Sequence, residues 1–161
     1  MTHTDLESAR NIASNVPDPE LPYLTLTDLG ILRAVELQGD TIVAQVSPTY
    51  SGCPALDVIE QSVLEALQQA GFKARVERVM SPPWTTDWIT EEGHRKLTLN
   101  GIAPPQRTQI TQNTLFAKTQ INCPNCNSSD TCKVSEFGST PCKAQYTCNS
   151  CSEPFEYFKC H

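Results

Sequence analysis

Apolar and polar positions alternate along the first hundred residues in ways that predict three helices and three strands. Four apolar residues share one face of a helix predicted over residues 5–15: Leu6, Ala9, Ile12 and Ala13. The proline-rich segment that starts at Val16 ends this helix, because proline disfavours helical backbone at the residue before it. Strands are predicted over residues 29–37 and 41–47, and Gly39 in the turn between them makes a β-hairpin.

A second helix is predicted over residues 54–70, with Pro54 at its start and Gly71 as its stop. A third strand over residues 72–80 and a short helix over residues 90–97 follow it. The order helix, β-hairpin, helix, strand, short helix predicts an α+β fold, with a small α/β domain over residues 1–100. Residues 101–120 carry prolines and a Gln/Thr-rich stretch, which is typical of a linker.

The final segment, residues 121–161, contains two Cys-x-x-Cys pairs: Cys123 with Cys126, and Cys148 with Cys151. Two such turns supply the four thiolates of a tetrahedral metal site. About 40 residues cannot bury enough apolar surface to fold alone, so a metal is expected to hold this segment as a β zinc ribbon. Zinc is the favoured metal, and a mononuclear iron centre is the main rival.

The composition of the chain limits the cellular compartments and the classes of binding partner that we expect. The 161 residues have no apolar run near the roughly 18 that a membrane span needs, and the N-terminus lacks the basic and apolar parts of a signal peptide. We therefore expect a cytoplasmic protein with no membrane partner, where paired cysteines indicate metal rather than disulfides. Residues 1–100 hold 14 acidic and 7 basic side chains, net −7, and residues 101–161 hold 4 and 5, net +1. No basic face is available for nucleic acid.

The four cysteines outside these two pairs have different expected roles. Cys53 precedes the predicted second helix in a Gly-Cys-Pro turn, where helix N–H groups favour a thiolate; a buried structural thiol is the alternative. Cys132, Cys142 and Cys160 are expected to pack as small apolar side chains, although Cys142 could replace a metal ligand and Cys160 adjoins His161.

Several acidic residues also draw attention, but their spacing alone favours a structural role. Asp18, Glu20 and Asp28 flank prolines and turns, where such residues commonly shape the backbone. Glu91 and His94 supply half of a di-iron motif, which needs a second copy on long bundle helices that this chain lacks. No nucleotide-binding loop or serine-hydrolase elbow is present.

Four short segments together resemble the iron–sulfur assembly family once called domain of unknown function 59: Asp18-Pro19-Glu20, Asp28-Leu29-Gly30, Gly52-Cys53-Pro54 and Pro82-Pro83-Trp84-Thr85. The resemblance covers about residues 5–100. It implies the same order of elements and a part in delivering iron–sulfur clusters to client proteins. It also implies that Cys53 is the reactive residue, which would hold or pass iron or a cluster in a pocket shaped by Asp18 and Glu20.

A chain that combines this domain with a C-terminal ribbon resembles a narrower family, the D subunits of phenylacetyl-CoA epoxidase systems in phenylacetate degradation. The matching segments include residues 47–55, 137–140 and 153–159. The resemblance implies an accessory subunit that matures a metal centre in a partner, most directly the flavin- and [2Fe–2S]-containing reductase, without catalysing epoxidation. A structural subunit of the oxygenase complex is the alternative, and an enzyme with Cys53 as nucleophile is a third hypothesis. Asn127 stands where such ribbons often have Gly, and Asn tolerates the left-handed backbone required there.

Overall fold

The computed structural model describes residues 3–50, 52–105 and 121–159. These residues form an α+β fold with two compact units, residues 1–93 and residues 94–161. The predicted boundary at residue 100 therefore lies a few residues beyond the division between the units. That division falls within the residue range of helix α3 (Glu91–Leu99).

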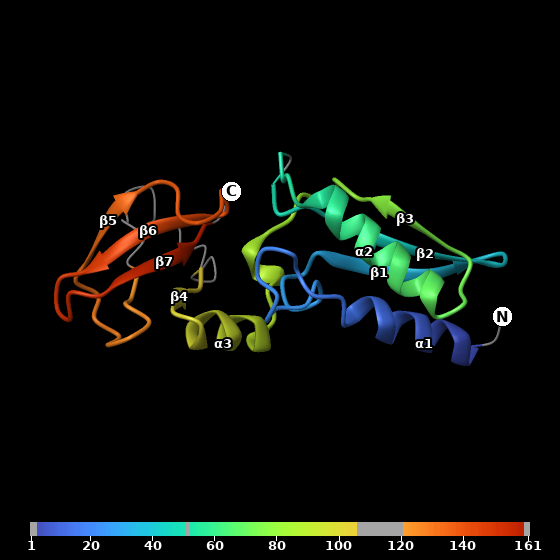
Figure 1. Ribbon diagram of the computed structural model, residues 1–161, viewed down its shortest axis with the longest axis horizontal. Helices are drawn as coiled ribbons and strands as arrows, with labels where there is room; N and C mark the ends of the chain where they lie inside the picture. The colour runs from blue at the N-terminus through green and yellow to red at the C-terminus, as the bar shows by residue number, and fades with distance from the viewer. Residues whose placement is uncertain (1–2, 51, 106–120, 160–161) are drawn as a thin grey trace. The chain divides into compact units, whose positions relative to one another are not determined.

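The N-terminal unit contains a three-stranded sheet and two long helices (Figure 1). Helix α1 (His3–Ser14) precedes strands β1 (Leu32–Gln38) and β2 (Thr41–Val46), which form the predicted antiparallel hairpin. Helix α2 (Leu56–Gln69) then leads to strand β3 (Ala74–Arg78), which pairs with β2 in parallel. A parallel pair needs a long crossover connection, and α2 supplies it.

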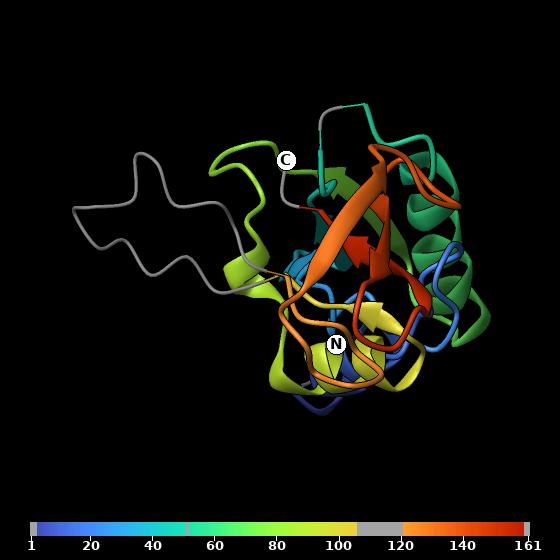
Figure 2. The ribbon, with the colours of Figure 1, turned by 90° about the vertical axis from the view of Figure 1, so that its left-hand side faces the viewer.

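Strand β2 lies in the middle of the sheet, and helices α1 and α2 pack against each other and against the sheet. Figure 2 turns the ribbon by 90° and shows α2 in green at the right. Ile42, Ala44 and Val46 are fully buried, as the predicted alternation requires. Val43, on the opposite face of the strand, is also fully buried. The simple alternation therefore identified only one of the two faces of a central strand.

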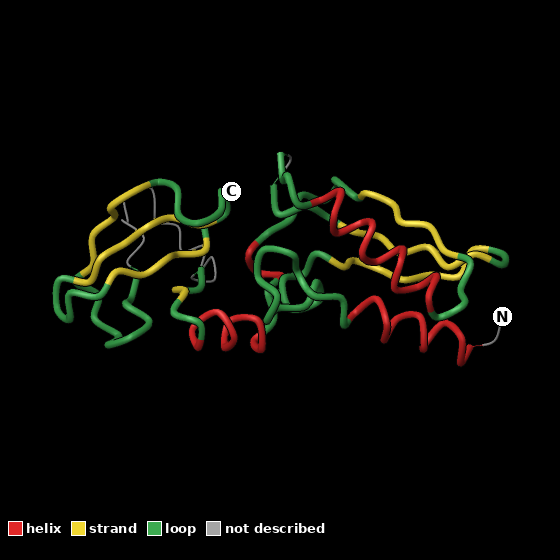
Figure 3. Tube along the Cα trace, viewed as in Figure 1, coloured by secondary structure: helices red, strands yellow, loops and turns green. Residues whose placement is uncertain are grey.

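A series of turns, rather than a strand, fills the chain between α1 and β1 (Figure 3). The first predicted strand began at Leu29, but β1 begins only at Leu32. Gly30 has a φ of +66°, a left-handed conformation that turns the chain there. The indole N–H of buried Trp84 donates to the carbonyl of Leu29 at 2.9 Å, which fixes this turn against the segment after β3. The turn is therefore part of the core although it is not a strand.

The C-terminal unit is a four-stranded sheet in the order β4-β7-β6-β5. Its strands are β4 (Ile102–Ala103), β5 (Thr131–Ser135), β6 (Lys143–Cys148) and β7 (Pro154–Phe158). Strand β4 belongs to the stretch predicted as a linker, residues 101–120, and it pairs with β7 in parallel. Residues 106–120 of that stretch lie outside the described residues.

The core of the C-terminal unit combines aromatic residues with two of the predicted ligand cysteines. Tyr146 stacks on Phe155 at a ring-centroid distance of 5.8 Å and meets Tyr157 edge-on at the same distance. Cys123 and Cys148 are buried in this same cluster. The predicted metal site is therefore built into the core of the unit.

Candidate metal centre and reactive cysteine

Two turns with the same hydrogen bonds carry the four predicted ligands: a first knuckle, residues 123–127, and a second knuckle, residues 148–152. The N–H of Asn127 donates to the carbonyl of Cys123, and the N–H of Ser152 donates to the carbonyl of Cys148, both at 2.9 Å. Asn127 and Ser152 have φ values of 59° and 62°. The left-handed conformation expected at Asn127 is confirmed, and the second knuckle repeats it with a serine.

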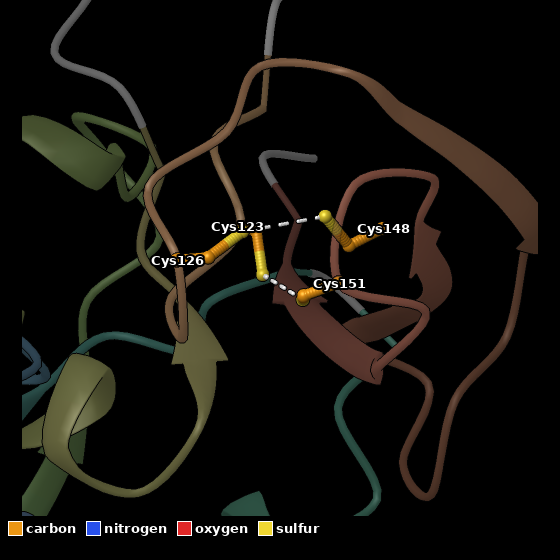
Figure 4. A group of neighbouring side chains, drawn as sticks. All are labelled: Cys123, Cys126, Cys148 and Cys151. Atoms are coloured by element: carbon orange, nitrogen blue, oxygen red, sulfur yellow. Dashed lines mark hydrogen bonds between the residues drawn. The ribbon is translucent and has the colours of Figure 1, made fainter.

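The two knuckles point their thiols at one another (Figure 4). The four Sγ atoms all lie within 4.8 Å of one another. The Sγ of Cys123 is 3.7 Å from that of Cys151, and the Sγ of Cys126 is 3.5 Å from that of Cys148. A tetrahedral zinc site with Zn–S bonds of about 2.3 Å has sulfur–sulfur edges of about 3.8 Å. The arrangement therefore fits a tetrahedral four-sulfur metal site.

The electrostatics of the four thiols also favour a bound cation. The backbone N–H groups of Cys151 and Ser150 lower the pKa of Cys148 to about 7. At Cys126 the N–H of Ser128 favours the thiolate, but the neighbouring thiols outweigh it and raise the pKa of Cys126 to about 12. The Cys148 thiolate is therefore favoured and the Cys126 thiolate is opposed by its neighbours, an opposition that a bound cation would relieve.

The remaining cysteines lie apart from the four-sulfur group. Cys142 is buried, and its Sγ is 3.0 Å from the hydroxyl of Thr140, so its predicted packing role is confirmed. Cys132 is exposed, with its thiol 3.8 Å from the side-chain oxygen of Asn149, so the predicted packing role is wrong for that residue. It lies on β5, a strand at the edge of the sheet whose last four residues are all exposed. Cys160 and His161 lie outside the described residues.

Cys53 lies on the turn that leads from β2 into α2. Its N–H donates to the carbonyl of Tyr50 at 3.1 Å, and its own carbonyl accepts from the N–H of Leu56 at 3.3 Å. Helix α2 begins at Leu56 rather than at Pro54, because residues 54 and 55 form the turn that precedes it. The thiol is half-buried at the start of the helix.

The environment of Cys53 favours the neutral thiol, contrary to the expectation from its place before a helix. Burial raises the pKa of Cys53 most, and the negative charges of Glu20 and Asp18 raise it further. The backbone N–H groups of Ala55 and Leu56 act in the opposite direction but do not prevail. The residues around Cys53 in the sequence indicated the helix N–H groups, and the family resemblance placed Asp18 and Glu20 near the thiol, but neither indicated that burial and these charges raise its pKa.

Asp18 and Asp28 shape the turns that precede β1. Oδ1 of buried Asp18 accepts from the N–H groups of Glu20 and Leu21 at 2.9 and 2.8 Å, which positions Glu20. Oδ2 of Asp28 accepts from the N–H of Thr25, and the carbonyl of Asp28 accepts from the N–H of Thr90, each at 2.9 Å. These contacts of both aspartates are those of the turn-forming role that the spacing favoured.

Among residues 3–50, 52–105 and 121–159, only the four ribbon cysteines gather as a set of three or more metal-binding side chains. Cys53, Asp18 and Glu20 are close enough to interact electrostatically but do not form such a set, and neither do Glu91 and His94. No helix in the same ranges is long and apolar enough to cross a bilayer.

Two contacts in the ribbon were not predicted from the sequence. The Nζ of buried Lys143 pairs with Oε2 of Glu156 at 2.9 Å, and the hydroxyls of Ser128 and Ser150 meet at 2.7 Å between the knuckles. Serine beside cysteine and charged residues on a strand are common, so no signal in the sequence distinguishes these residues.

Comparison with known proteins places both units in established families. The family described as "Iron-sulfur cluster assembly protein" matches residues 7–79, and the "PaaD zinc beta ribbon domain" matches residues 107–159. A crystal structure of a domain of unknown function 59 from Bacillus anthracis shares the fold with a TM-score of 0.53. It is 22% identical and covers 58% of this chain and 92% of that chain.

One relative spans almost the whole length. It is the Escherichia coli (strain K12) protein named as the D subunit of a "Putative 1,2-phenylacetyl-CoA epoxidase". The two sequences are 44% identical over 150 residues, which is 92% of this chain and 89% of the relative. The chain therefore belongs to the family of phenylacetyl-CoA epoxidase D subunits, which join an iron–sulfur assembly domain to a zinc ribbon.

Proposed function

We propose that this chain is an accessory subunit of a phenylacetyl-CoA epoxidase system that delivers iron or an iron–sulfur cluster to a partner subunit. Membership of the D-subunit family and the match of residues 7–79 to iron–sulfur assembly proteins support this proposal. The reductase of such a system is the partner we favour, because it carries the cluster that would need maturation.

The observation that carries the proposal is the placement of Cys53 within electrostatic reach of Glu20 and Asp18. Iron–sulfur clusters are commonly held by four cysteine thiolates, and this site has one. It therefore cannot enclose a cluster alone, and a second protein must supply further ligands. A single thiol suits brief holding and transfer better than permanent storage.

The raised pKa of Cys53 suits the same role. At neutral pH the thiol stays protonated, because burial and the two carboxylates disfavour the thiolate. An arriving iron cation reverses the balance: the thiol releases its proton, the thiolate binds the metal, and Glu20 and Asp18 now stabilise the positive charge. Cys53 is then a neutral thiol while no iron is bound. It returns to that state when the partner protein takes the iron or cluster.

The ribbon has a different task in this proposal. Cys123, Cys126, Cys148 and Cys151 hold structural zinc, since four thiolates close the coordination shell and leave no open position for chemistry. The zinc stabilises the fold of the ribbon, and the ribbon docks the client. Cys53 carries the transfer.

The decisive experiment replaces Cys53 by serine in a strain that grows on phenylacetate. We expect the partner reductase to lose most of its cluster content, measured by iron and sulfide analysis and by its visible spectrum. Cys132→Ser is the matched control, because that thiol is exposed and is neither Cys53 nor one of the four grouped cysteines. Normal cluster content and normal growth in Cys53→Ser would refute the transfer role.

A structural role in the complex predicts the opposite pattern. Stable stoichiometric co-purification of Cys53→Ser with the other subunits, together with normal cluster content, would favour that alternative. Transient association with loss of cluster would favour delivery.

A further inference from the structure

Contacts that involve no ligand sulfur join the two knuckles of the ribbon. The Oγ of Ser128, just after the first knuckle, lies 2.7 Å from the Oγ of Ser150 within the second. The side-chain amide of Asn149 donates to Oδ1 of Asp130 at 2.8 Å. The backbone N–H of Asn149 donates to the carbonyl of Asp130 at 2.9 Å. Three polar contacts therefore connect the loop after one pair of cysteines to the loop between the other pair.

These contacts depend on one another. The Oγ of Ser128 also accepts from the N–H of Asp130 at 3.1 Å. That bond fixes the hydroxyl of Ser128 toward Ser150 and fixes the backbone of Asp130 toward Asn149. Asn149 and Ser150 lie between the ligands Cys148 and Cys151. Contacts that restrain these two residues therefore also restrain the positions of both thiols of the second knuckle.

We propose that Ser128, Asp130, Asn149 and Ser150 are positioning residues that form a clasp, holding the two Cys-x-x-Cys turns at the separation a tetrahedral metal requires. This proposal depends on the proposed metal site and assigns further residues to it. Four thiols on two separate turns lose conformational freedom when they converge on one ion. Contacts that order the turns reduce this cost and slow metal release. Loss of a group that orients metal ligands typically weakens binding 10- to 100-fold.

Cobalt titration of the full-length chain under reducing, anaerobic conditions tests the clasp. Thiolate-to-cobalt absorption reports binding, and the visible bands report the geometry of the four ligands. We expect Ser150→Ala and Ser128→Ala each to weaken cobalt binding about tenfold and to speed its loss to a chelator by a similar factor. Because Ser128→Ala already removes both the hydroxyl pair and the bond from the N–H of Asp130, the double variant should fall within about twofold of Ser128→Ala.

Two further variants separate positioning from a general loss of stability. Ser150→Thr keeps the hydroxyl and should restore cobalt affinity to within about threefold of the unaltered chain, with the same visible bands. Ser129→Ala is the matched control, because Ser129 is exposed beside Ser128 and its side chain makes no hydrogen bond among the described residues. It should bind as the unaltered chain does.

The outcomes distinguish the clasp from the metal site on which it rests. If Ser150→Ala releases cobalt no faster than Ser129→Ala, the clasp is refuted while the metal site stands. If Ser150→Thr is as weak as Ser150→Ala, the hydroxyl pair does not position the ligands. If the unaltered chain gives no thiolate–cobalt absorption, the metal site itself fails.

Discussion

The two units of this protein use cysteine in opposite ways. The N-terminal unit has a core of fully buried aliphatic residues, such as Leu24, Ile42 and Leu67, and its single thiol, Cys53, lies half-buried outside that core. In the ribbon, two of the eight residues of the core cluster are the ligands Cys123 and Cys148. We therefore expect the N-terminal unit to fold without its thiol and the ribbon to depend on its cysteines. The cysteine proposed to be reactive is the one that lies outside a core.

The largest expected effect comes from removing a ligand thiol. Cys148→Ser should abolish metal binding and unfold residues 121–159, because most of the binding free energy of a structural zinc, about 10–16 kcal/mol, is folding free energy. Metal analysis should give one zinc per unaltered chain and none for the variant. Amide hydrogen exchange should show lost protection in β5, β6 and β7 and unchanged protection in β1, β2 and β3.

Cys142→Ser is the matched control for that experiment, since both cysteines are buried in the same unit but only Cys148 belongs to the four-sulfur group. Serine can keep the contact with Thr140, so we expect full metal content and a loss of about 1 kcal/mol. Equal metal loss in the two variants would mean that Cys142 acts as a ligand.

The next effect concerns a part of the ribbon that the metal does not hold. Glu156→Gln leaves the buried ammonium of Lys143 without its carboxylate and should destabilise the ribbon by about 3 kcal/mol. Thermal unfolding of the metal-loaded chain measures this loss. Glu153→Gln, an exposed change one residue before β7, should leave the midpoint unchanged. A similar midpoint for both variants would show that the metal alone stabilises the ribbon.

The same ion pair predicts a pH dependence. Burial of Glu156 raises its pKa, but the N–H of Ser139 and the ammonium of Lys143 outweigh burial and hold the pKa below its ordinary value of 4.5. A lowered pKa in the folded state adds stability that is complete above 4.5 and is lost as the pH falls through the lowered value. The difference between the unaltered chain and Glu156→Gln should therefore stay constant from about pH 8 to about pH 5 and shrink below 4.5.

In the N-terminal unit, stability is most sensitive to substitution where the backbone at Gly30 approaches Trp88 closely. A Cβ at Gly30 would lie 2.5 Å from the Cβ of Trp88, and φ there is +66°. Gly39 has a φ of +65° with nothing within 4 Å of an added Cβ. Gly39→Ala should cost only the left-handed strain, about 1 kcal/mol, and Gly30→Ala about 3 kcal/mol, because the clash adds to the strain. Tryptophan fluorescence reports this unit alone, since both tryptophans, Trp84 and Trp88, lie in it.

Local patterns explain what the sequence predicted well. The order of helices and strands follows from periodicities that span a few residues, and the helix stop at Gly71 is confirmed by its φ of +87°. The knuckle turns follow from the spacing of two cysteines and one left-handed residue, so the four ligands and Asn127 could be identified without any long-range information.

Contacts between distant segments explain what the sequence did not predict. Leu29 and Ile31 are apolar and buried, which suggested a strand, yet Gly30 and the contact from Trp84, 55 residues away, make that segment a turn. Burial raises the pKa of Cys53 most, and Glu20 and Asp18 raise it further although they lie far upstream, a direction that the neighbouring residues alone did not indicate. A short window can show the helix that follows a thiol but not the charges that approach it from another turn.

The smallest expected effect tests that last interaction directly. Glu20→Gln removes one of the charges that oppose ionisation, so the pKa of Cys53 should fall and its alkylation by iodoacetamide at about pH 8 should become about two- to threefold faster. Peptide mapping by mass spectrometry follows each cysteine separately. Exposed Cys132 serves as the internal reference in the same digest, and Glu65→Gln, an exposed change on α2, is the matched control. An unchanged rate at Cys53 would show that the charge of Glu20 does not contribute to its raised pKa. A faster rate would show that the Glu20 carboxylate opposes ionisation of the thiol.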